Sequence, residues 1–343
     1  MTKRRGGRFE TSFNIFTQLS QNMKIEESYI CGKHTKADCE DGMVITPWFV
    51  AVIDGSTSKT PRRLDPTMKN GRLAMLIISQ HIKTMSASTT MEQFCEGVTR
   101  RIANEYERHG VAERMGAHPE ERLTASAIIY SVQRREVWMV GDCQAIVDNT
   151  FFDNAKPYEQ HIATLRANMI KEGMAPADAR RAIEPQLVEA MLQGQNTSYA
   201  VIDGTPIYMA GTRTVAVSHA AVLASDGYPF LHPTLKESEE ALARQLADDP
   251  QNISSFVATK GLVEGNNQHS LTFKIKDYEL QHNSVSVNTH SIYNYPHLRF
   301  SSIPKWVVDA CLCCYAIICV GSLCYFYNDE FRRFNRAKKC ESI

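Results

Sequence analysis

The sequence lacks an excess of charge of either sign. Its 343 residues include 38 lysines and arginines and 38 aspartates and glutamates, so the formal net charge at pH 7 is zero. Because attraction to a phosphate backbone depends on an excess of basic groups, this balance disfavours a nucleic-acid partner. Hydrophobic residues make up 43% and charged residues 22% of the chain. Such a composition is typical of sequences that bury a core, and it excludes wholesale disorder.

Cysteines are scarce over most of the chain. Of the ten, the four in the first 300 residues are Cys31, Cys39, Cys95 and Cys143. Their wide spacing, and a segment 9–24 that is too polar for the apolar region of a signal peptide, predict a cytoplasmic domain. No histidine partner for Cys143 is evident in the sequence, so we expect it to be a packing residue. The phosphate-binding patterns GxxxxGK and GxGxxG are also missing, and nucleotide-dependent chemistry is not indicated.

Long apolar runs are missing until residues 306–327, which contain one charge, Asp309. A helix needs about 20 apolar residues to cross a bilayer, so this run predicts a transmembrane helix over 305–328 and membrane association through it. A buried hydrophobic hairpin or helix remains the alternative. We expect an N-terminal extension (1–24), a domain (25–275), a polar linker (276–304) and a basic tail (329–343) around this run.

Apolar periodicity predicts a mixture of strands and helices. Strands are expected at 48–53, 124–132, 136–140, 199–202, 206–209, 214–224 and 271–275. Helices are expected at 71–85, 91–109 and 235–246, with several short helices in 155–195. Several strands follow each other through short turns, whereas parallel strands need long crossovers. The order therefore favours an α+β fold with mostly antiparallel sheets covered by helices.

Carboxylates stand at the ends of three apolar strands. Asp54, Asp142 and Asp226 each neighbour a glycine there, and the pair Glu40 and Asp41 lies shortly before the first of these strands. Any one of these sites alone is more often a turn than a metal ligand. Carboxylates at strand ends can meet at one edge of a sheet, where oxygen ligands suit magnesium or manganese. The joint pattern predicts a metal site.

The segments around these carboxylates resemble a known family. The sequences are DCEDGM (38–43), VAVIDGS (50–56), TASA (124–127), VGDCQA (140–145) and LASDG (223–227). Their order and context are similar to those of metal-dependent protein phosphatases of the type-2C family. The resemblance covers roughly residues 25–275, about three quarters of the chain.

The resemblance implies a fold, a cofactor and an activity. The fold would be a β-sandwich of two antiparallel sheets flanked by helices, as the strand order also favours. Asp54 would bridge two Mn²⁺ or Mg²⁺ ions, with Glu40 and the carbonyl of Gly55 serving one ion and Asp226 the other. Asp142 would match the position of a third, more weakly held ion. The implied activity is hydrolysis of phosphoserine or phosphothreonine in a phosphoprotein substrate by a water that the two ions activate.

Three positions depart from the family pattern. Lys36 occupies the position at which the family usually has an arginine that binds phosphate. A lysine keeps the positive charge but cannot form the bidentate contact of an arginine. The alternative is that Lys36 is a solvated surface lysine. Ser56 replaces a histidine proposed as proton donor, and serine is a poor donor. His269 lies where the family has a metal-binding aspartate, and a polar loop residue is the alternative. These departures keep open a second function, an inactive pseudophosphatase that binds a phosphorylated or regulatory partner.

Overall fold

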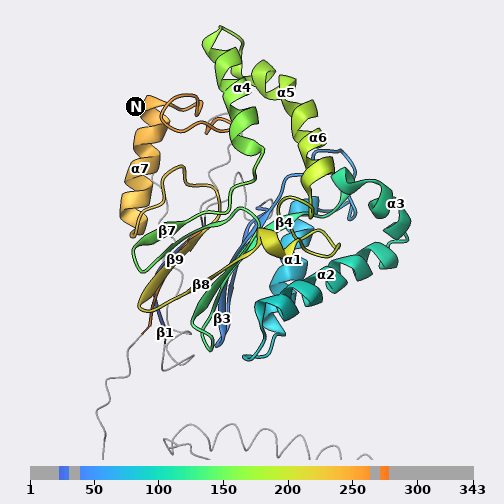
Figure 1. Ribbon diagram of the computed structural model, residues 1–343, viewed down its shortest axis with the longest axis vertical. Helices are drawn as coiled ribbons and strands as arrows, with labels where there is room; N and C mark the ends of the chain where they lie inside the picture. Colours follow the sequence, from blue (N-terminus) through green and yellow to red (C-terminus); the bar gives the residue numbers. More distant parts are fainter. Residues whose placement is uncertain (1–22, 31–38, 263–270, 278–343) are drawn as a thin grey trace, which may run out of the picture. The chain divides into compact units, whose positions relative to one another are not determined.

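The computed structural model describes residues 23–30, 39–262 and 271–277, all of which belong to the unit Met1–Gln281 (Figure 1). Lys36, His269 and the predicted helix 305–328 lie outside these ranges. Among the residues that are described, no helix has both the length and the apolar character needed to cross a bilayer.

Two five-stranded sheets form the centre of this unit, and every pair of neighbouring strands is antiparallel. In spatial order, the first sheet contains β2 (Gly42–Ile45), β3 (Phe49–Gly55), β4 (Ala125–Ser131), β5 (Glu136–Val140) and β8 (Arg213–Ala216). The second contains β1 (Met23–Ile30), β10 (Leu271–Asp277), β9 (Ala220–Ala224), β6 (Gln144–Val147) and β7 (Thr150–Phe152). The predicted α+β class with antiparallel sheets is confirmed.

The strand β3 is buried on both faces. Val50 and Val52 pack between the sheets against Ala145 and Leu223 of the second sheet. Their neighbours Phe49, Ala51 and Ile53 point the other way, into a core shared with helices. Because successive side chains of a strand face opposite sides, a strand covered on both faces is apolar throughout. This explains the unbroken run before Asp54.

Helices cover the outer face of each sheet (Figure 1). The helices α1 (Asn70–Lys83) and α2 (Met91–Arg108) pack on the first sheet, and α2 begins with a capping box at Thr90. The helix α7 (Leu235–Asp248) packs on the second sheet through Leu242. The remaining helical elements are α3 (Ala112–Ala117), α4 (Glu159–Lys171), α5 (Pro176–Ala182), α6 (Glu184–Gly194) and the 3₁₀ turns Pro119–Glu121 and Met209–Gly211. Figure 1 shows α4, α5 and α6 together at one end of the sandwich.

The predicted strand 214–224 is wrong in one respect, because it is two strands in different sheets. The chain leaves β8 at Ala216 and enters β9 at Ala220. Between them, the carboxylate of Asp148 accepts hydrogen bonds from the backbone N–H groups of Ser218, His219 and Ala220 at 2.7, 2.8 and 2.9 Å. This side chain fixes a sheet-to-sheet crossing that apolar periodicity alone does not reveal.

The predicted strands 199–202 and 206–209 are also wrong. In this region Ile202 forms an isolated bridge with Ala125, and 209–211 is a 3₁₀ turn. The side chain of Asn196 accepts hydrogen bonds from the backbone of Val201 and Tyr208, at 3.1 and 3.2 Å. Side-chain amide groups thus satisfy backbone donors that a sheet would otherwise satisfy.

Candidate active site

Asp54 occupies the penultimate position of β3, opposite Ser126 on β4. The Ser126 hydroxyl donates a hydrogen bond to Oδ1 of Asp142, which follows β5, and accepts one from the Asp142 backbone N–H at 3.2 Å. Gly141, at φ +91°, allows the turn between β5 and Asp142, because this backbone region favours glycine. Ser126 therefore connects the ends of the neighbouring strands β3, β4 and β5 on one side of the first sheet.

Carboxyl groups from both sheets surround Asp54. Burial raises the pKa of Asp54 well above its usual value, and the charges of Asp41, Asp226 and Asp142 raise it further. Asp226 follows β9 in the second sheet, whereas Asp41 precedes β2 in the first. Asp54 and Asp226 thus lie on the same side of the sandwich, as an acidic site made from both sheets requires.

Glu40 is buried beside the loop that follows β3. Its Oε2 accepts a hydrogen bond from the Thr57 hydroxyl at 3.0 Å and lies 3.6 Å from Nζ of Lys69. A Cβ atom on Gly71 would lie 2.7 Å from Oε1 of Glu40, and one on Gly55 would lie 2.5 Å from the Glu40 carbonyl oxygen. These glycines let the backbone approach the carboxylate closely. Glu40 and the Gly55 carbonyl, predicted to serve the same ion, therefore belong to one tightly packed group.

Asp142 is held by two protein groups. Besides the Ser126 hydroxyl on Oδ1, the Lys156 ammonium forms an ion pair with Oδ2. Burial opposes ionisation of Asp142, but the Lys156 charge and these hydrogen bonds outweigh it and lower the pKa to about 2. Both carboxylate oxygens have protein partners, so in this structure a lysine cation neutralises the side chain predicted to hold a third metal ion.

A second lysine, Lys260, belongs to the same electrostatic group. The charge of Asp226 is the main cause that raises the pKa of Lys260, and Lys260 in turn lowers the pKa of Asp54. Lys156 and Lys260 were both missed by the sequence analysis. Single lysines in polar loops carry no spacing that separates them from solvated surface lysines, and neither is near the acidic motifs in sequence.

The chemistry of the donors fits divalent cations. Asp41, Asp54, Asp226 and Glu40 supply hard carboxylate oxygens, and the closely packed Gly55 backbone supplies a carbonyl. Burial and, after it, repulsion from neighbouring carboxylates raise the pKa of Asp54, and a bound cation would relieve this repulsion. In the described ranges, however, no group of three or more His, Cys, Asp and Glu side chains is arranged as a metal site.

Cys143 lies directly beside this acidic group. Its side chain is buried, and burial raises the pKa of the thiol well above its usual value, with further increases from Asp54, Asp142 and Asp226. Because the thiolate is the nucleophilic form, this environment disfavours reactivity. The prediction that Cys143 is a packing residue is confirmed.

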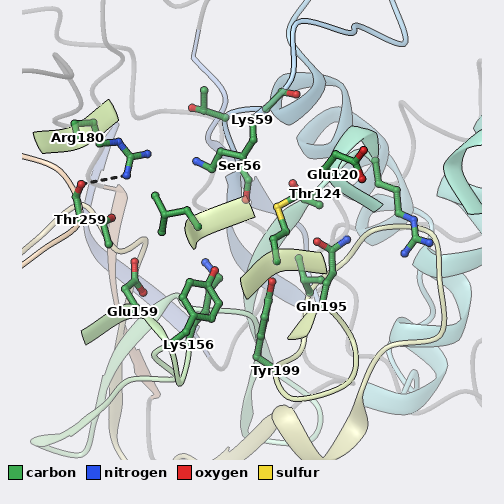
Figure 2. Close-up of a pocket in the computed structure, with 17 residues that line it drawn as sticks. Ser56, Lys59, Glu120, Thr124, Lys156, Glu159, Arg180, Gln195, Tyr199 and Thr259 are labelled. Atoms are coloured by element: carbon green, nitrogen blue, oxygen red, sulfur yellow. Dashed lines mark hydrogen bonds between the residues drawn. The ribbon is translucent and has the colours of Figure 1, made fainter. Parts of the chain in front are cut away.

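A small pocket of about 110 Å³ opens beside the acidic site (Figure 2). The loop Ser56–Lys59 after β3 lines one wall, and residues of α4, α5 and α6, including Glu159, Arg180 and Met191, line another. Lys156, the partner of Asp142, also lines the pocket and so connects it to the acidic site. The short helices predicted in 155–195 therefore form part of its wall.

Comparison with known proteins gives structural likeness only. No family model and no curated protein matches the chain. Among solved structures, the chain is similar to PppA, a key regulatory component of T6SS in Pseudomonas aeruginosa, with 12% identity and a TM-score of 0.39 over 75% of this chain and 98% of that one. It is also similar to the catalytic domain of the serine/threonine protein phosphatase PstP in complex with two manganese ions, with 12% identity and a TM-score of 0.39 over 75% and 99%.

A third similar structure is the serine/threonine phosphatase Stp1 from Staphylococcus aureus, with 13% identity and a TM-score of 0.37 over 75% of this chain and 96% of that one. Two of these three structures, PstP and Stp1, are serine/threonine phosphatases. Likeness this distant carries no conclusion about activity, which has to be argued from the site itself.

Proposed function

We propose that this chain hydrolyses phosphoserine or phosphothreonine in phosphoproteins and that the reaction depends on two Mn²⁺ or Mg²⁺ ions. The observation that carries the proposal is the position of Asp54, whose pKa is raised by burial and by carboxylates from both sheets. Such a concentration of negative charge is costly unless cations compensate it. The activity is assigned to residues 25–275, and the extension 1–24, the linker 276–304 and the tail 329–343 remain predictions.

Each acidic residue has a separate role in this proposal. Asp54 would contact both ions, Glu40 and the carbonyl of Gly55 one of them, and Asp226 the other. The ions, when bound, would lower the pKa of water and neutralise charge on the phosphoryl oxygens. Asp142 would position Ser126 and Lys156 and would hold a third ion only if Lys156 releases it. No acid for the leaving group is evident in the loop after β3, where Ser56 follows Gly55, so solvent would supply that proton.

Lys36 and His269 complete the proposal from outside the described residues. Lys36 would bind the phosphoryl group, and His269 would add a nitrogen ligand to one ion, which suits manganese better than magnesium.

The experiment is phosphate release from a phosphothreonine peptide by the full chain, with and without Mn²⁺. We expect turnover that requires Mn²⁺, stops on chelation, and falls by at least about a hundredfold in Asp54→Asn and Asp226→Asn, because each removes a charge from the ion site. Asp248→Asn, at the exposed end of α7, is the matched control and should retain activity. Turnover that persists in a chelator would overturn the proposal.

A second candidate function is favoured by the lysines. Lys156 is paired with Asp142, and Lys260 lies near Asp226 and Asp54, so the chain itself supplies cations to the acidic group. A pseudophosphatase would bind a phosphorylated or regulatory partner without turnover. In such a protein Lys156 and Lys260 would stabilise the acidic group in place of metal ions. Calorimetric titration with Mn²⁺ separates the two functions, because the pseudophosphatase should hold at most one ion weakly.

A further inference from the structure

A side chain of the protein supplies a cation to Asp142, the residue predicted to hold a third metal ion. Nζ of Lys156 forms an ion pair with Oδ2 of Asp142, and the Ser126 hydroxyl donates a hydrogen bond to Oδ1. Burial alone would lower the pKa of Lys156, but the charges of Asp142 and Glu159 outweigh it and raise the pKa well above its usual value. Asp142 is thus in contact with an ammonium group at neutral pH.

The chain segment that carries Lys156 is fixed to the turn that carries Asp142. Nδ2 of Asn154 donates a hydrogen bond to the carbonyl oxygen of Gly141 at 2.9 Å. Gly141 directly precedes Asp142, so this hydrogen bond and the ion pair join the same two segments. Pro157 follows Lys156, and its ring fixes its own φ and restricts the residue before it. The backbone therefore holds Lys156 at Asp142 before any ligand binds.

On its other side, Lys156 is fixed to the helical insert, which comprises residues 155–195 with α4, α5 and α6. The backbone N–H of Glu159, the first residue of α4, donates a hydrogen bond to the Lys156 carbonyl oxygen at 3.1 Å. The ring of Tyr158, between them, packs edge-on against the ring of Tyr199, with centroids 5.5 Å apart. The ammonium group of Lys156 therefore connects the start of the insert to the acidic site.

A divalent ion and the Lys156 ammonium would compete for the same carboxylate. Both side chains of the ion pair are mostly buried, and solvent and salt screen the repulsion between like charges only weakly in such a place. An ion that bound Oδ2 of Asp142 would also have to replace the hydrogen bond that Lys156 donates to this oxygen. The residues around Asp142 therefore do not fit a third ion while Lys156 is in contact with it.

We propose that Lys156 is a built-in substitute for the third metal ion, so that the acidic site takes two ions and no third. The inference rests on the proposed function, because it concerns the ions of the same site. Lys156 also lines the pocket beside the acidic site, together with Glu159 (Figure 2). Neither dilution nor a chelator removes a lysine, so this positive charge stays in place at every metal concentration.

The test counts the Mn²⁺ ions that the full chain binds, so that it does not depend on turnover. Electron paramagnetic resonance of the free Mn²⁺ gives the number bound, in a titration from micromolar to millimolar concentrations. Lys156→Ala removes the ammonium and opens the position of its side chain to the pocket. We expect this variant to bind about one ion more per chain than the parent, because Asp142 then becomes available as a carboxylate ligand.

Matched variants serve as controls. Lys156→Arg keeps a positive charge at this position and should bind as many ions as the parent. Lys171→Ala removes an exposed lysine from α4 in the same helical insert and should also leave the number unchanged. In the double variant Lys156→Ala/Asp142→Asn the additional ion should be lost again, because asparagine lacks the charge of the ligand. Thermal unfolding checks each variant, and Lys156→Gln replaces Lys156→Ala if the latter does not fold.

Asp142→Asn alone provides a test in the opposite direction. It should leave the number of bound ions as in the parent, because Lys156 and not an ion is the partner of Asp142. The inference is overturned if Asp142→Asn loses an ion, or if a folded variant without the ammonium gains none. A gain that persists in the double variant would also overturn it, since the additional ion would then bind elsewhere.

Failure of the inference is distinguishable from failure of the proposed function. The gain is measured as the difference between Lys156→Ala and the parent, so it is observable whether or not the parent hydrolyses a phosphopeptide. Mn²⁺-dependent turnover by a parent that loses an ion in Asp142→Asn removes the inference alone. A gain that depends on Asp142, in a chain without any turnover, removes the phosphatase activity and leaves the inference.

Discussion

The backbones of Gly55 and Gly71 approach so closely that a Cβ atom on Gly55 would lie 2.2 Å from the Gly71 carbonyl oxygen. Gly55 ends β3 and Gly71 lies in the first turn of α1, so this contact joins the strand that carries Asp54 to the helix that covers it. The same Cβ would lie 2.5 Å from the carbonyl oxygen of Glu40. The acidic site is therefore built on backbone packing as well as on charge.

Gly55→Ala should destabilise the fold by about 1–3 kcal/mol, because backbone atoms cannot move aside as the end of a flexible side chain can. Chemical denaturation in a chelator measures the change without any contribution from metal. Gly116→Ala is the control, since a Cβ there meets nothing within 4 Å, and its effect should be near zero or slightly stabilising. Equal stability of Gly55→Ala and the parent would show that this packing is not as tight as described.

The ion pair between Lys156 and Asp142 should behave as a buried pair. Their side chains are 18% and 11% exposed, and both oxygens of Asp142 accept hydrogen bonds. Lys156→Met should therefore cost about 3 kcal/mol of unfolding free energy, because it leaves a buried carboxylate without its cation. Denaturant titration in a chelator is the measurement.

A double-mutant cycle separates this effect from simple loss of packing. Combined with Asp142→Asn, Lys156→Met should cost clearly less than the sum of the single changes. The exposed Lys171→Met should change stability by less than about 0.5 kcal/mol. Strictly additive single changes would mean that the pair contributes no interaction of its own.

His81 should make the protein sensitive to mild acid. Its ring stacks on Phe94 with centroids 5.8 Å apart, and both ring nitrogens are buried. Burial and the charge of Arg101 lower the pKa of His81 to about 4, from its usual 6.5. The unfolded chain therefore binds the proton more readily, and the stability present above pH 6.5 is lost as the pH falls toward 4.

The measurement is the melting temperature between pH 7 and pH 4. In His81→Gln, which cannot gain a proton, the decline should be less steep than in the parent, although carboxylates affect both proteins alike. Parallel curves for the two proteins would contradict the expected role of His81.

Much of the fold follows from sequence where one pattern dominates. The helices α1, α2 and α7 and the strands β3, β4, β5 and β10 were predicted to within a few residues because their apolar spacing is regular. β1, β2, β6 and β7 were not predicted. The sequence did contain a signal for the turn between β6 and β7, namely the residues Asp148 and Asn149. Aspartate and asparagine tolerate the positive φ that tight hairpins require, and both residues adopt it in the structure.

The acidic site was more predictable than the groups around it. Asp54, Asp142 and Asp226 stand at strand ends next to glycine, and the structure places them within electrostatic reach of each other. Lys59 and Lys156 reach the same region from a loop and from the start of the helical insert. Their position depends on how distant segments pack, which has no periodic signature in the sequence.

Calorimetric titration of the full chain with Mn²⁺ tests the central claim most directly, because it counts cations at the acidic site whether or not a substrate is known. The parent and Asp248→Asn should each bind about two ions, whereas Asp54→Asn and Asp226→Asn should lose one or both. A parent that takes up no Mn²⁺, or uptake that is unchanged in both site variants, would contradict the account.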